Sequence, residues 1–225
     1  MSIQIDCIRI FGFRGIKKAE IHLPRVALLI GTNNSGKTSV IKALQLALGD
    51  YSRFLTEQDF HIDKGDKRCS EILVDVRIVP IDEDGERSKD FNDEWVEEFE
   101  DKIRFEVDDK QFLPIRTKAF SDSIKGGFKA ERYILDEWPD ASNWETINTP
   151  KSKKLTKRYD TLPYFSIDAQ RDIHQELNEK NSFVGRVLSS VDYEKADVVD
   201  LEKMVAKINT AAVEKSEPLK ELKEN

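Results

Sequence analysis

The sequence predicts an α/β fold in which a mixed β-sheet and helices surround a phosphate-binding loop. Five consecutive apolar residues at 26–30, too few for a helix, are followed by a glycine-rich loop and an amphipathic stretch at 38–48. Apolar and polar residues alternate at 2–10 and 18–23, before this unit. We therefore expect a buried strand, a loop and a helix, joined to an antiparallel β layer.

The loop that follows the predicted buried strand reads G-T-N-N-S-G-K-T, which is the P-loop pattern. Gly31 and Gly36 can adopt positive φ, so that successive backbone N–H groups point at an anion. Lys37 can bring its ammonium to the β and γ phosphates of ATP, and the Thr38 hydroxyl can bind Mg²⁺. The predicted nucleotide-binding residues are Gly31, Asn33, Asn34, Ser35, Gly36, Lys37, Thr38 and Ser39, with Thr38 also the Mg²⁺ ligand.

A glycine turn that matches this pattern by chance is the alternative to a P-loop. The context favours the P-loop, because an apolar strand precedes it and a helix follows it. Ile41, Leu44 and Leu48 share one face of that helix, and Gly49 is placed to end it.

Composition limits the classes of protein to which the chain can belong. It has 225 residues, 39% of them hydrophobic, and a formal net charge of −7, which does not indicate nucleic-acid binding. We expect a cytoplasmic protein without a membrane partner, since no apolar run approaches the roughly 20 residues of a membrane span. The two cysteines and three histidines have no metal-binding spacing, so neither a disulfide framework nor a zinc site is predicted.

Further strands and one helix are expected between residues 71 and 167. Asn92 can cap a helix that runs to about residue 102, and the acidic turn at 82–85 lacks the remaining ligands of a calcium site. Breaker residues predict a mobile loop over 138–158, and its basic part could contact DNA phosphates or simply be solvated. Strands are expected at 71–79, 103–107, 111–115, 131–136 and 163–167.

The opening I-R-I-F-G-F-R-G-I, followed by L-I-G-T-N-N-S-G-K-T-S-V-I-K-A-L, resembles ABC-type ATPase heads of the SMC and recombination-repair group. The resemblance implies the N-terminal half of a P-loop NTPase head, truncated before its second half. Arg14 would contact phosphate, unless it is a surface arginine in a turn. Gln58 or Asp59 would act like the Q-loop of such heads, unless these residues serve in capping or turn chemistry.

The same resemblance implies a domain organisation. Residues 1–197 would form the N-terminal portion of the ATPase domain, and 198–225 would begin a helical arm. Within the first part, 1–62 would be the P-loop core and 71–167 a β-rich accessory region.

The segment Y-F-S-I-D-A-Q-R-D-I-H-Q-E-L, together with the E-Q-D-F loop, resembles OLD-family ATP-dependent endonucleases. The resemblance implies ATP and Mg²⁺ as cofactors, DNA as a partner, homodimers formed through the ATPase heads, and a Toprim nuclease that this chain lacks. The signature motif, the Walker B strand and the switch histidine are not found in the sequence. We therefore expect the chain alone to bind nucleotide without hydrolysing it. The alternatives are a head of an SMC-like repair or chromosome-structure ATPase, or a nucleotide-binding interaction module that does not hydrolyse.

Overall fold

The computed structural model describes residues 2–33, 35–49, 51–123 and 126–156, together with 159, 162, 164 and 203. The chain divides into two compact units, Met1–Ser166 and Ile167–Asn225. In the second unit only Lys203 is described, and only Tyr164 is described within the predicted strand at 163–167. That strand, the helices expected after it and the predicted helical arm at 198–225 therefore lie outside the described residues.

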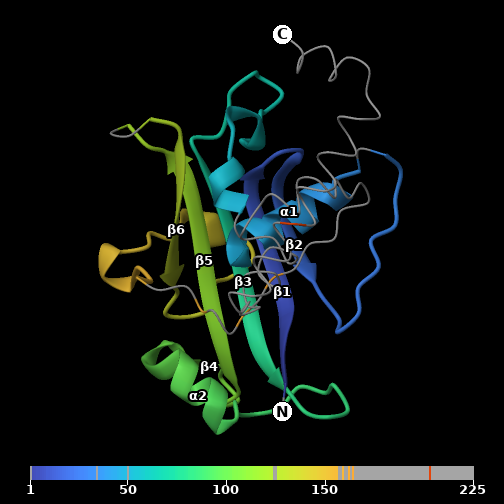
Figure 1. Cartoon of the computed structure of the whole chain (residues 1–225), viewed down its shortest axis with the longest axis vertical. Coiled ribbons are helices and arrows are strands. Elements are labelled where there is room, and N and C mark those ends of the chain that lie inside the picture. Colours follow the sequence, from blue (N-terminus) through green and yellow to red (C-terminus); the bar gives the residue numbers. More distant parts are fainter. Residues whose placement is uncertain are drawn as a thin grey trace. The chain divides into compact units, whose positions relative to one another are not determined.

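The first unit is built on one six-stranded sheet in which every neighbouring pair is antiparallel (Figure 1). The strand order is β2-β1-β3-β5-β4, and β6 also pairs with β5. This sheet is the antiparallel layer that the alternating sequence pattern predicts. The strands are β1 (Ser2–Phe13), β2 (Ile16–His22), β3 (Glu71–Ile81), β4 (Arg104–Phe105), β5 (Gln111–Ser121) and β6 (Phe128–Ile134).

Helix α1 (Lys37–Leu48) packs on one face of the sheet, in front of the strands in Figure 1. It ends where the sequence predicts, because the Gly49 N–H bonds to Gln45 O and a Cβ at Gly49 would lie 2.7 Å from that oxygen. Helix α2 (Asp93–Phe99) begins after its predicted cap, since Asn92 accepts a hydrogen bond from Trp95 N. The 3-10 turns are η1 (Tyr51–Phe54), η2 (Glu57–Asp59), η3 (Glu100–Lys102), η4 (Trp144–Thr146) and η5 (Lys151–Lys153).

The hydrophobic core lies between α1 and the sheet. The strand predicted at 71–79 forms as β3, and all four residues of its apolar face are buried there. The helix contributes Val40, Ala43, Leu46 and Ala47, and Leu44 and Leu48 pack against this core. Ile41, Leu44 and Leu48 also line a cavity beside the helix. The β3 residues are Ile72, Val74, Val76 and Ile78.

The opposite face of the sheet carries charged residues beneath an ordered loop. Trp144 is fully buried, and Arg9 lies over the ring of Trp138, 4.4 Å from its centroid. The prediction of a mobile loop over 138–158 is therefore wrong for its first half. The two tryptophans provide the apolar surface that anchors a segment whose prolines and asparagines suggested mobility.

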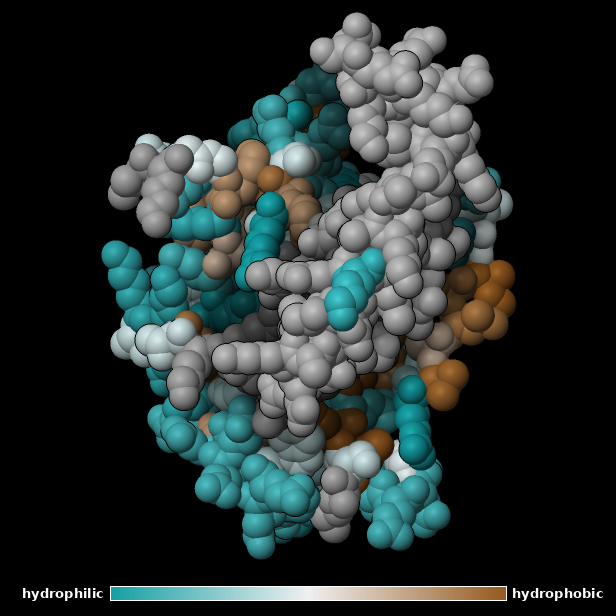
Figure 2. Space-filling view, in the orientation of Figure 1, coloured by the Kyte–Doolittle hydropathy of each residue, from teal (hydrophilic) through white to brown (hydrophobic). Residues whose placement is uncertain are grey.

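The prediction of a buried strand at 26–30 is also wrong. This segment is extended but belongs to none of the described strands, and Val26, Leu28 and Ile30 are 86%, 80% and 85% exposed. Figure 2 shows hydrophobic atoms gathered at the margin of the molecule along which this segment runs in Figure 1. Within the described residues no strand lies beside it to cover that side. Only its alternate residues, Ala27 and Leu29, face the cavity beside α1.

Candidate nucleotide-binding site

The predicted phosphate-binding loop closes tightly on itself between the extended segment and α1. Gly36 has φ +91°, the left-handed region that an L side chain adopts only with strain. A Cβ at Gly31 would lie 2.6 Å from Ser35 Oγ, so a larger residue would displace the Ser35 side chain. The backbone path of the loop therefore requires glycine at position 36, and the packing of Ser35 favours glycine at position 31.

The ammonium group of Lys37 is turned into the loop. Its Nζ donates to Gly31 O at 2.7 Å and to Thr32 O at 2.6 Å, and lies 3.3 Å from Ser35 Oγ. The lysine thus lies between two backbone carbonyl groups of the loop. An incoming phosphate oxygen would find a positive charge already held at the loop.

The start of α1 is suited to an anion. No side chain caps the helix at Gly36, and its first turn contains no acidic residue. By helix geometry the N–H groups of Lys37, Thr38 and Ser39 have no acceptor within the helix, so the positive end of its dipole is uncompensated. A phosphate group would satisfy both requirements.

The other end of α1 is held by Arg132 from β6. Its Nε donates to Ala47 O at 2.6 Å, and its Nη2 donates to Gly49 O at 3.1 Å and Leu46 O at 3.2 Å. A cation at the C-terminus of a helix complements the negative end of its dipole. Arg132 therefore fixes the P-loop helix to the sheet, a role that the sequence alone does not reveal.

Two predicted site residues, Arg14 and Asp59, contact each other. Arg14 Nε donates to Asp59 Oδ1 at 2.8 Å, and Arg14 Nη2 donates to the Tyr51 hydroxyl, which itself donates to Asp59 Oδ1 at 2.9 Å. Burial would raise the pKa of Asp59. The bonds from the Thr56 amide, Arg14 and Tyr51 outweigh burial and hold this pKa below its ordinary value.

This ion pair lies in the turn region that borders the P-loop. Arg14 has φ +50° at the turn between β1 and β2, and Ile16 of the same hairpin lies 3.9 Å from a Cβ built on Gly36. The guanidinium of Arg14 is bonded to Asp59. Its contact with phosphate stays a prediction.

Most of the remaining predicted residues lie at the surface. Asn33, Ser35 and Thr38 are exposed, and Gln58 is exposed on η2 while its neighbour Asp59 points inward. Ser39 is half-buried, and Asn34 lies outside the described residues. The Mg²⁺ role of Thr38 and the Q-loop role of Gln58 or Asp59 also stay predictions.

A cavity of about 980 Å³ lies beside the loop and reaches Lys37 and Thr38. Its walls are mainly apolar and come from the start of β1, the segment 23–29 and the outer side of α1. Tyr164 closes part of it, and its hydroxyl donates to Ile41 O at 3.2 Å.

The basic segment at 151–158 is partly neutralised by neighbouring acids. Lys153 pairs with Asp136 at 2.5 Å, and Lys154 pairs with Glu131 at 2.8 Å. Residues 157 and 158 lie outside the described residues. The two described ion pairs weaken the case for this segment as a DNA contact.

The loop, its lysine and the uncapped helix define a P-loop nucleotide-binding protein. The family model described as AAA ATPase domain matches residues 4–225. The chain belongs to this family and is an ATP-binding ATPase domain. The match and the antiparallel sheet confirm the predicted fold class, a P-loop ATPase head.

One solved structure comes from work on ATP-driven dimerization and DNA-stimulated activation of SMC ATPases. It is 17% identical to this chain, with a TM-score of 0.41, and the match covers 82% of this chain and 95% of that one. No curated protein matches the chain. Among the described residues, no helix is long and apolar enough to cross a membrane.

Proposed function

We propose that this chain binds MgATP through the loop at residues 31–38 and is the nucleotide-binding half of an ATP-dependent DNA endonuclease of the OLD type. The observation that carries nucleotide binding is the Lys37 ammonium, held over a glycine loop at the uncapped start of α1. Gly31 and Gly36 keep the loop narrow, and the amides that follow Gly36 receive the phosphates. Thr38 binds Mg²⁺ together with the nucleotide.

The assignment to the OLD type rests on sequence motifs. The F-G-F-R-G turn before the P-loop, the E-Q-D-F loop after α1 and the Y-F-S-I-D-A-Q-R-D segment support it together. In this proposal two heads form a homodimer with ATP between them, and nucleotide binding regulates an attached Toprim nuclease that cleaves DNA.

Hydrolysis should need residues beyond those of this chain. The signature motif, the Walker B strand and the switch histidine that such heads use are not found in its sequence. The 225-residue chain is therefore expected to hydrolyse ATP no faster than background. Turnover that disappears in a Lys37→Ala variant would contradict this proposal.

The experiment that tests the nuclease proposal is a cleavage assay of plasmid DNA with the complete gene product and MgATP. We expect the parent protein to nick or linearise the plasmid. Lys37→Ala should change this cleavage, whereas Lys67→Ala, which removes an exposed lysine elsewhere, should leave it intact. If ATP binds but DNA is never cleaved, the protein is an SMC-like head without a nuclease, and the OLD assignment is wrong.

A further inference from the structure

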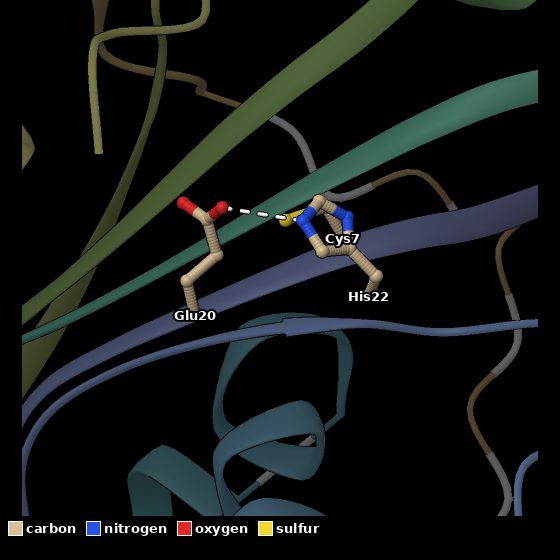
Figure 3. A group of neighbouring side chains, drawn as sticks. All are labelled: Cys7, Glu20 and His22. Atoms are coloured by element: carbon tan, nitrogen blue, oxygen red, sulfur yellow. Dashed lines mark ion pairs between the residues drawn. The ribbon is translucent and has the colours of Figure 1, made fainter.

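Three side chains able to bind metal meet on the strand pair β1 and β2. Cys7 lies directly opposite His22 in the sheet register, and Glu20 is two residues before His22 on the same face of β2. Their ligand atoms all lie within 4.8 Å of one another (Figure 3). The sequence spacing of these residues resembles no metal motif, and only the strand register brings them together.

The spacing of these atoms is close to that of a tetrahedral zinc site. Ligands bound to zinc at about 2.0–2.3 Å lie about 3–4 Å from one another. Glu20 Oε1 and His22 Nε2 are already 3.3 Å apart, as the dashed line in Figure 3 marks. A small inward movement of side chains would complete three bonds to one ion. A thiol, an imidazole and a carboxylate are ligands that Zn²⁺ accepts, whereas Ca²⁺ and Mg²⁺ require oxygen.

We propose that Cys7, Glu20 and His22 bind one Zn²⁺ ion, with a fourth position open to solvent. This site is formed by residues other than those of the P-loop and does not depend on the proposed nuclease function. On binding, the Cys7 thiol loses its proton to solvent and the thiolate sulfur bonds to the ion.

The site is open to solvent on one side and closed on the other. Strand β2 is at the edge of the described sheet, and the side chains of His22 and Glu20 are 72% and 25% exposed. Cys7 is fully buried beneath them. An ion can therefore arrive past His22 and Glu20 and reach the sulfur at the bottom of the site.

Neighbouring side chains support Glu20 as a ligand. Arg9 Nε donates to Glu20 Oε2 at 2.5 Å, which leaves Oε1 directed at His22. Arg9 is itself fixed by a bond from its Nη1 to Pro139 O at 2.7 Å. Such a hydrogen bond to the second carboxylate oxygen orients a metal ligand.

Two arginines lie near the proposed cation, and acidic groups balance both. Glu20 pairs with Arg9, while Arg77 pairs with Asp6 at 2.6 Å and with Glu106 at 3.2 Å. Burial first, and then the Glu20 carboxylate, raise the pKa of Cys7 to about 12. The thiol is therefore neutral without metal, so metal binding releases its proton.

The test is a titration of the untagged chain with Co²⁺, whose bond to a thiolate gives a charge-transfer absorption band. We expect this band in the parent chain and in Cys69→Ser, which removes the other free cysteine. It should be lost in Cys7→Ser. Zn²⁺ should displace Co²⁺ and abolish the band. A band that survives in Cys7→Ser, or one that never forms in the parent chain, would overturn the proposal.

His22→Gln keeps the proposal testable if Cys7→Ser does not fold, because His22 is largely exposed. We expect it to weaken Co²⁺ binding by about 10-fold or more and to remove the rise in melting temperature that Zn²⁺ gives the parent chain. Unchanged Co²⁺ affinity in this variant would also overturn the proposal. Lys37→Ala should bind Co²⁺ normally, so that failure of the metal site and failure of nucleotide binding can be distinguished.

Discussion

Arg116 of β5 donates two parallel hydrogen bonds to Asp75 of β3, from Nε to Oδ1 at 2.8 Å and from Nη2 to Oδ2 at 2.7 Å. Neither side chain is exposed. The same guanidinium donates to Trp144 O at 2.7 Å and to Ile147 O at 2.9 Å. One buried ion pair therefore joins two strands of the sheet to the loop that covers them.

Arg116→Met should destabilise the chain strongly, because it leaves the Asp75 carboxylate buried without its partner. The expected loss is about 3–5 kcal/mol in the free energy of unfolding, measured by chemical denaturation. The double variant Asp75→Leu with Arg116→Met should recover much of this loss, since it removes the buried charge as well. A double variant less stable than Arg116→Met alone would contradict this account of the pair.

Gly36→Ala should damage the P-loop through its backbone. Gly36 has φ +91°, so an alanine there costs about 1–2 kcal/mol of strain or forces the loop to change shape. We expect weaker MgATP binding, measured by calorimetry, and a lower melting temperature. Gly15→Ala is the matched control, because no atom lies within 4 Å of a Cβ built there. Equal effects of the two variants would show that the left-handed backbone at Gly36 is not required.

The stability supplied by Asp59 should depend on pH. Its pKa in the folded state lies below the ordinary value of 3.8, so its stabilising effect is fully present above pH 3.8. The effect should be lost as the pH falls through the lower folded-state pKa. The difference in unfolding free energy between the parent chain and Asp59→Asn should therefore be largest near neutral pH and shrink in acid. A difference that grows in acid would contradict the hydrogen bonds from Arg14, Tyr51 and Thr56 as its source.

The P-loop and the antiparallel layer could be predicted because their signals are local. Alternating residues such as Ile72 and Val74 predict a strand with one face in the core, and Gly31 and Gly36 occur at the fixed spacing of a phosphate loop. Gly49 marks the end of α1 through its backbone, and Asn92 marks the start of α2 through its side chain. These features need no knowledge of distant residues.

The structural features that could not be predicted from the sequence depend on contacts between residues far apart in the chain. Apolar residues at 26–30 predict burial, but no described strand covers Val26, Leu28 and Ile30. The anchoring of the loop at 138–147 depends on the contact of Trp144 with Arg116, on the face of the sheet that this loop covers. Cys7 lies opposite His22 because of the register of the β1–β2 hairpin. The sequence near residue 11 predicts a turn but does not give that register. A careful pairing of residues 7–11 with 18–22 could have found that cluster.

The loop at residues 31–38 should bind ATP through Lys37. The direct measurement is the Kd for MgATP of the folded chain, compared among the parent, Lys37→Ala and the exposed-lysine control Lys67→Ala. Loss of a hydrogen bond from a charged donor should weaken binding by about 10- to 100-fold in Lys37→Ala only. Equal affinity of the parent and Lys37→Ala, with both proteins folded, would show that Lys37 does not hold the nucleotide.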